Sequence, residues 1–126
     1  MSTILRQRLP ATVHAVPEAR HTALAALRGA GFDRQPLLDD VALALSEAVG
    51  NVARHAYPEG PGQLELEVRT DAQDVVVIVS DEGVGAREPS DRPGLGLGLQ
   101  LIKAKTRSWV LESDGSGTRV TMRFAC

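Results

Sequence analysis

Three polar residues share one side of a predicted helix and have the chemistry to bind a cation or move a proton. Glu47, Asn51 and His55 follow one another at intervals of four residues, which stacks side chains along one helix face. Asn51 offers a neutral oxygen to Mg²⁺, which takes oxygen ligands, and Glu47 can accept a proton from a nucleophile. Gly50 among them would let another group approach the helix. The alternative is a solvated helix face with an incidental glycine.

A carboxylate and two glycines follow the most apolar segment of the chain. Residues 75–79 are apolar throughout, which predicts a central strand buried on both faces, and Asp81 comes just after them. A carboxylate held at the end of such a strand could accept a hydrogen bond from an exocyclic amine such as that of adenine. Gly83 and Gly85 would allow a sharp turn and let a flat base pack against the backbone. An ordinary strand-ending turn is the alternative interpretation.

Two further glycine-rich segments lie nearer the C-terminus. Gly94, Gly96 and Gly98 alternate with leucines ahead of a predicted helix, where backbone N–H groups are available to an anion. The leucines argue against a flexible linker, which would be polar. The segment is not a P-loop, and Leu99 does not suit a dinucleotide-binding fingerprint. Residues 115–118 form a predicted hairpin turn that is uninformative taken alone.

The spacing of apolar residues predicts the elements that position these segments. Residues 64–68 alternate in polarity and should form a hairpin with 75–79, with one face in water. Helices first and strands later indicate an α+β two-layer sandwich, with helices on one face of a mixed, mostly antiparallel sheet. The remaining expected elements are an edge strand within 3–13, helices over 17–28, 36–56 and 99–106, a loop over 81–98, and strands over 109–111 and 120–124.

Length and composition limit the class of protein. The 126 residues suit a single domain over 1–126, and 43% hydrophobic residues exclude a disordered chain. A net charge of -2 and only 3% aromatics argue against a nucleic-acid surface and predict an aliphatic core. No apolar run approaches the ~18 residues of a membrane span, and the start does not resemble a signal peptide. With Cys126 as its single cysteine, the chain is expected to be cytoplasmic.

In combination, these segments resemble the GHKL, or Bergerat-fold, ATPase superfamily. Residues 47–51 look like its N box, 81–85 like its G1 box, 94–99 like its G2 box and 115–118 like its last glycine-threonine box. Residues 46–57 are similar to the Ser-Glu-Ala-Val-x-Asn-x-x-x-His-Ala-Tyr run of the anti-sigma factor serine kinases. The resemblance extends over nearly the whole chain.

The resemblance implies a Bergerat ATP-binding fold and a role for each matched residue. Asn51 would ligate the Mg²⁺ that bridges the ATP phosphates, Glu47 would be the general base toward a serine hydroxyl, and Asp81 would bind the adenine amino group. The serine would belong to an anti-anti-sigma protein of the STAS type, and the chain, as a homodimer, would sequester a sigma factor. The other implied nucleotide contacts are His55, Gly83, Gly85, Gly94, Gly96, Gly98, Leu99 and Thr118.

Three functional hypotheses remain open at this point. The first is a serine kinase that is also an anti-sigma factor, and the presence of Glu47 favours it. The second is a nucleotide-sensing switch without catalysis, favoured by the short segment 86–93 between the G1-like and G2-like boxes, where family kinases commonly have a longer lid. The third is an isolated histidine kinase-like ATPase domain. Against it, His14 and His21 lie in or beside the first predicted helix and not on a dimerisation hairpin.

Overall fold

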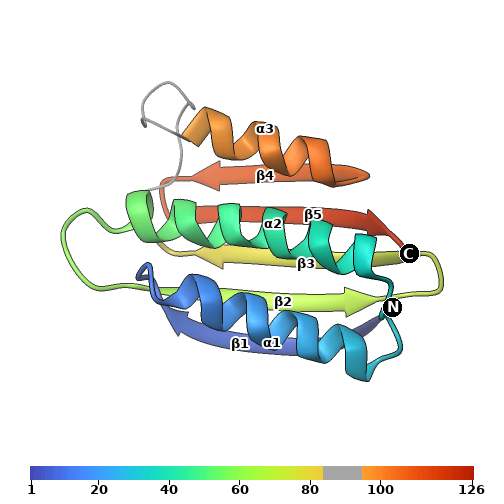
Figure 1. Cartoon of the computed structure of the whole chain (residues 1–126). Coiled ribbons are helices and arrows are strands. Elements are labelled where there is room, and N and C mark those ends of the chain that lie inside the picture. The colour runs from blue at the N-terminus through green and yellow to red at the C-terminus, as the bar shows by residue number, and fades with distance from the viewer. Residues whose placement is uncertain (84–94) are drawn as a thin grey trace.

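Two layers build the fold: an antiparallel sheet, and helices that cover one of its faces (Figure 1). The structure, a computed structural model, describes residues 1–83 and 95–126. In chain order the elements are β1 (Ser2–Pro10), α1 (Ala15–Gly29), α2 (Gln35–Asn51), the π-helical turn η1 (Val52–Ala56), β2 (Gln63–Thr70), β3 (Asp74–Asp81), α3 (Leu95–Lys105), β4 (Ser108–Asp114) and β5 (Gly117–Ala125).

The sheet has the strand order β1-β2-β3-β5-β4, and each of the four pairings among the described residues is antiparallel. The predicted α+β sandwich and the predicted hairpin, now β2 and β3, are confirmed, and the predicted edge strand is β1. Strand β3 is central, and residues 75–79 are buried on both faces as expected. Its central position fixes where the chain emerges after Asp81.

The core between the two layers is aliphatic, as the scarcity of aromatics predicts. Small residues on the inner side of α1, such as Ala19 and Ala23, bring that helix close to the sheet, and both are fully buried. Helix α2 presents Val41 and Leu45 to the same core, at the i, i+4 spacing of an amphipathic helix. Among the described residues, no helix has the length and apolar character that crossing a bilayer demands.

Two predicted helix boundaries need correction. The helix expected over 36–56 is α-helical only to Asn51 and continues as the π-helical turn η1, a form common at functional sites. The third helix begins at Leu95, so residues 95–98, predicted as loop, form its first turn. Glycine disfavours helix by about 1 kcal/mol relative to alanine. Burial of the side chains of Leu99 and Ile102, both in α3, offsets this cost.

On the sheet face without helices, a buried carboxylate joins two strands. Glu67 is 5% exposed, although the alternation in β2 predicted a solvated side chain. Arg6 of β1 approaches its Oε1 to 2.6 Å, and Arg69 contacts its Oε2. Burial raises the pKa of Glu67, but the hydrogen bonds and charges of the two arginines outweigh burial and hold that pKa below its usual value.

We expect this ion-pair cluster to make stability depend on pH. A carboxylate whose pKa is lowered by folding stabilises the protein above the unfolded pKa of about 4.3, and this contribution is lost as the pH falls through the lower folded pKa. Glu67→Gln should therefore lower the free energy of unfolding at neutral pH by about 1–2 kcal/mol. It should also flatten the acid limb of a plot of melting temperature against pH.

The matched control is Glu65→Gln, because the side chain of Glu65 is 37% exposed and its arginine contacts are 3.9 and 4.0 Å long. Its effect should stay within about 0.5 kcal/mol. Identical acid limbs for the wild type and Glu67→Gln would contradict the assignment.

Candidate functional site

A cavity opens between α2 and the sheet, where β3 ends. It holds about 430 Å³ of empty space, its opening to solvent included. Three of its lining residues are polar and the others are apolar, a composition that suits a flat apolar ligand with a few polar edge atoms. The lining residues are Ala48, Asn51, Val52, Ala56, Val79, Asp81, Leu99, Leu111, Thr118 and Val120.

Two of the polar lining residues are neighbours in the sheet. Asp81 is the last residue of β3 and pairs in register with Thr118 of β5. The Oδ1 atom of Asp81 accepts the N–H of Gly83 at 2.8 Å, and the hydroxyls of Thr118 and Ser113 lie 3.3 Å apart. The sequence predicted a rigidly held carboxylate at this strand end, and the structure places it on the cavity wall beside Thr118.

Glycine backbones pack tightly around that carboxylate. A Cβ atom at Gly83 would lie 2.1 Å from the carbonyl oxygen of Ala56 in η1. A Cβ atom at Gly117 would lie 2.1 Å from the carbonyl oxygen of Asp81, and Gly117 also has a φ of +153°. These positions require glycine because no side chain fits between the two backbones. The hairpin segment was uninformative in the sequence, and the structure shows a steric reason why residue 117 is glycine.

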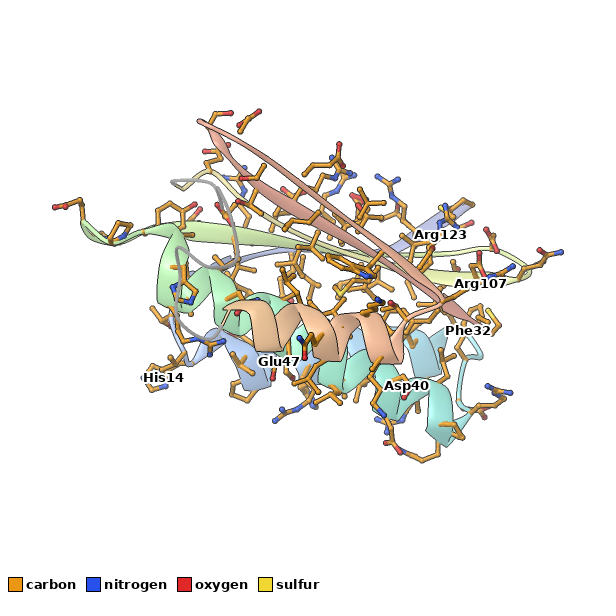
Figure 2. The ribbon with its side chains drawn as sticks, turned by 90° about the horizontal axis from the view of Figure 1, so that it is seen from above. His14, Phe32, Asp40, Glu47, Arg107 and Arg123 are labelled. Atoms are coloured by element: carbon orange, nitrogen blue, oxygen red, sulfur yellow. The ribbon has the colours of Figure 1, made fainter. Side chains whose placement is uncertain are left out.

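Two oxygen-bearing side chains of α2 meet the first turn of α3: Asn51, which lines the cavity, and Glu47, which does not line it. A Cβ atom at Gly98 would lie 3.1 Å from Nδ2 of Asn51 and 3.2 Å from Oε2 of Glu47. Figure 2 shows the Glu47 side chain beside α3. Of the predicted face of Glu47, Asn51 and His55, the structure brings Glu47 and Asn51 together at Gly98, whereas His55 lies in η1 beyond the end of the α-helix. The N–H groups of the first turn of a helix have no intrahelical partners, so this end of α3 favours anions.

The donor set fits Mg²⁺ that arrives with phosphates. The described residues contain no group of three or more His, Cys, Asp or Glu side chains able to hold a metal ion. Glu47 and Asn51 nevertheless place carboxylate and amide oxygens around one point, beside Gly98. Mg²⁺ is typically held by one or two protein oxygens together with substrate phosphates and water. The amide oxygen of Asn51 therefore suits a Mg²⁺ that is bound mainly by nucleotide phosphates, and these two residues do not make a metal site of protein alone.

Arg54 belongs to the same surface, although the sequence analysis did not single it out. Its Nη2 donates to Oδ1 of Asn51 at 3.0 Å, and its Nη1 would lie 3.0 Å from a Cβ atom at Gly50. Gly50 was predicted to let another group come close to the helix. The group that does so is the guanidinium of Arg54, from the turn η1 that continues α2. Arg54 is exposed, so its charge is available to an anion at this end of the cavity. The spacing could have indicated this contact, because residues three apart are neighbours on a helix surface and Arg54 follows Asn51 by three.

The other predicted residues have varied positions. Leu99 is buried and lines the cavity, and Gly96 lies in the first turn of α3. His55 lies in η1, half-buried, and is not among the lining residues. Gly85, Gly94 and the short segment 86–93 lie outside the described residues. One region therefore gathers Glu47, Asn51, Asp81, Gly83, Gly98, Leu99 and Thr118.

Comparisons with known proteins identify the family of the chain. The model of the histidine kinase-like ATPase domain family matches residues 9–124. The anti-sigma F factor of Clostridium acetobutylicum is 32% identical over 98 residues, which cover 68% of this chain and 68% of that protein. The anti-sigma F factor of Clostridium kluyveri is 30% identical over 125 residues, with 86% and 88% covered.

Solved structures share the fold at lower sequence identity. The RsbU and RsbW domains of a Mycobacterium tuberculosis protein match with a TM-score of 0.76 at 21% identity; 95% of this chain is covered, and it spans 31% of that chain's length. The histidine kinase domain of a blue-light activated kinase from Erythrobacter litoralis gives a TM-score of 0.61 at 18% identity, with 86% of this chain and 60% of that chain covered.

The fold and the cavity define an α+β domain of the GHKL ATPase type. The chain belongs to the histidine kinase-like ATPase domain family, and the curated relatives it matches are anti-sigma F factors. Membership of this family implies that the nucleotide is ATP.

Gly98→Ala tests the close approach of α3 to α2. The new methyl group would push against Asn51 and Glu47, so ATP binding should weaken by about tenfold or more, as displaced contact groups typically cause. The melting temperature should not fall, because alanine is favoured over glycine in a helix by about 1 kcal/mol. Calorimetric titration and a melting curve on the same preparation measure both effects.

Gly29→Ala is the matched control, because Gly29 ends α1 and nothing lies within 4 Å of a Cβ atom there. That variant should bind ATP as the wild type does. Wild-type affinity in Gly98→Ala would show that Asn51 does not take part in nucleotide binding in the way described.

Proposed function

We propose that the chain is an ATP-dependent protein-serine kinase and anti-sigma factor, which phosphorylates a STAS-type anti-anti-sigma protein and sequesters a sigma factor. The observation that supports it most is the arrangement at Gly98. There a carboxylate able to take a proton, Glu47, lies next to an amide able to ligate Mg²⁺, Asn51, at one end of an apolar cavity. Asp81, a hydrogen-bond acceptor suited to an amino group, lines the same cavity.

In this proposal the adenine ring occupies the apolar cavity. The carboxylate of Asp81 accepts a hydrogen bond from the exocyclic amine, and Thr118 supports the same wall of the pocket. Leu99 and Val79 contact the ring faces. The phosphates extend toward the first turn of α3, where helix N–H groups and Arg54 would balance their charge.

Phosphoryl transfer would need little from the protein besides positioning and charge neutralisation. The oxygen of the attacking serine forms a bond to the γ-phosphorus, the bond from that phosphorus to the β-phosphate oxygen breaks, and ADP leaves. Glu47 accepts the proton of the serine hydroxyl. Asn51 would hold Mg²⁺, which supplies positive charge to the phosphate oxygens.

The proposal also includes the assembly of the protein. We propose a single ATPase domain over 1–126 that acts as a homodimer on a sigma factor and on the phosphorylated partner. It is supported by the family match over 9–124 and by relatives that are themselves named anti-sigma F factors.

A nucleotide-sensing switch without phosphotransfer is the second candidate function. Its support is the short segment 86–93 between the G1-like and G2-like boxes. Such a protein would bind ATP in the same cavity and regulate its partners by contact alone. The two candidates therefore agree on ATP binding and differ on the role of Glu47.

Glu47→Gln separates the two candidates. It keeps the shape of the side chain and removes the basic oxygen, so transfer of labelled γ-phosphate to a STAS-type partner should fall by about 10²–10⁴-fold. The dissociation constant for ATP should stay within about twofold, because in this proposal Glu47 takes the serine proton and Asn51 holds the Mg²⁺ of the nucleotide. Phosphate incorporation is measured by electrophoresis, and binding by calorimetry.

Glu59→Gln is the control for loss of a carboxylate, because Glu59 is exposed in the loop before β2. It should phosphorylate the partner at the wild-type rate. If the wild-type protein binds ATP but transfers phosphate to no serine-bearing partner, the kinase proposal is contradicted. The nucleotide-sensing switch is then the function that fits.

A further inference from the structure

One tyrosine hydroxyl joins the ends of three elements beside the cavity. The Oη atom of Tyr57 donates to the carbonyl oxygen of Gln63 at 2.6 Å and accepts the N–H of Glu82 at 2.9 Å. Tyr57 directly follows η1, Gln63 begins β2, and Glu82 is the first residue after β3. Figure 1 shows the end of α2, the start of β2 and the end of β3 at one edge of the molecule. The phenol thus connects them through both a donated and an accepted bond.

The tyrosine ring packs directly on a glycine, Gly62. A Cβ atom at Gly62 would lie 2.3 Å from Cγ and Cδ1 of Tyr57, so the ring covers the Cα atom of Gly62 at a distance that only glycine permits. The carbonyl oxygen of Gly62 accepts the N–H of Ala11, just after β1, at 2.9 Å. The backbone on which the ring packs is therefore hydrogen-bonded to the segment just after β1.

The peptide next to the one that Tyr57 holds donates to the Asp81 carboxylate. Glu82 lies between Asp81 and Gly83, and the N–H of Gly83 is the donor to Oδ1 of Asp81 at 2.8 Å. The backbone of Gly83 packs on the carbonyl of Ala56, the residue just before Tyr57. A displacement of the Glu82 N–H would move the adjacent peptide, and with it the donor that fixes the carboxylate.

We infer that Tyr57 is a positioning residue that acts through Asp81 and sets the preference of the cavity for a base with an exocyclic amine. The inference rests on the proposed function, in which Asp81 binds that amine. Tyr57 does not line the cavity and does not touch the base. Its effect passes through Glu82 and Gly83 to the carboxylate.

This arrangement separates two parts of nucleotide recognition. The apolar walls formed by Val79, Leu99 and Leu111 contact any purine, whether or not it carries an amine. The phosphate contacts proposed above come from Asn51, Arg54 and the first turn of α3, none of which hydrogen-bonds the hydroxyl of Tyr57 in the described part of the chain. Loss of the hydroxyl should therefore weaken the amine contact and leave the other contacts in place.

Binding of two nucleotides by the full chain tests the inference. ATP carries the amine, and inosine triphosphate carries a carbonyl oxygen at the same position. The wild type should bind ATP about tenfold or more tightly than inosine triphosphate, as expected for a hydrogen bond to a charged group. In Tyr57→Phe this ratio should fall by about fivefold or more, almost entirely through weaker ATP binding.

A second variant and a control accompany that measurement. Gly62→Ala keeps the hydroxyl but displaces the Tyr57 ring from the backbone on which it packs. It should therefore also lower the ratio of ATP affinity to inosine triphosphate affinity. Gln63→Ala keeps the backbone carbonyl that Tyr57 uses and removes only an exposed side chain, so its ratio should equal that of the wild type. Melting curves confirm that each variant is folded.

A double-mutant cycle shows whether Tyr57 acts through Asp81. Asp81→Asn should itself remove most of the preference for ATP, and adding Tyr57→Phe should then change the ratio no further, because the two residues act on one contact. A further drop in the double variant would overturn the inference.

The remaining outcomes are distinct from one another. A folded Tyr57→Phe variant with the wild-type ratio would overturn the inference, and so would an equal loss of affinity for both nucleotides, which would indicate general support of the cavity. A wild-type chain that binds neither nucleotide, or binds both equally, would overturn the assigned role of Asp81 in the proposed function itself.

Discussion

Burial of the central strand on both faces is the constraint on which the site depends. The inner face of β3 packs against the helices, while the outer face has no helix above it. Val76 and Ile78 on that outer face are nevertheless only 2% and 4% exposed. Their neighbours in the adjacent strands include Glu67 and Arg69, and long charged side chains can cover apolar surface with their stems. The arginine and glutamate cluster therefore helps to hold β3, and β3 holds Asp81.

From that strand end, the site is built by backbones that approach one another closely. Gly83 packs on η1, Gly117 packs on the carbonyl of Asp81, and Gly98 brings α3 to the polar face of α2. A methyl group would block the contacts at Gly83 and Gly117, and at Gly98 it would push the side chains of Asn51 and Glu47 aside. The glycines thus connect strand, helix and loop without side chains, and they leave the cavity between Asp81 and Asn51 open for a ligand.

Much of this was predictable because the signals are local. Alternation and apolar runs identified the β2–β3 hairpin and the buried central strand, and the four-residue spacing placed Glu47 and Asn51 on one face. The start of α3 was predicted wrongly because two glycines disfavour helix locally, whereas packing that involves residues far apart in sequence decides the outcome. The π-helical turn after Asn51 gives no periodic signal, since it is shorter than the window from which a period can be recognised.

The contacts that were not predicted are those between distant segments. Burial of Glu67 depends on Arg6 from β1, 61 residues away in the chain. The bond from Glu82 to Tyr57 spans 25 residues and involves a backbone N–H, which carries no residue-type signal. Spacing within one segment indicates a face of a helix or strand, but it does not show which other segment packs on that face.

The most direct test of the account is a calorimetric titration of the purified chain with ATP, with and without Mg²⁺. We expect saturable binding that tightens when Mg²⁺ is present, because Asn51 provides too few oxygens to hold the ion without the phosphates. No saturable binding up to about 1 mM ATP, the upper end of common enzyme affinities for substrates, would contradict it. In that case the cavity beside Asp81 would not be a nucleotide site, and the domain would act through protein contacts alone.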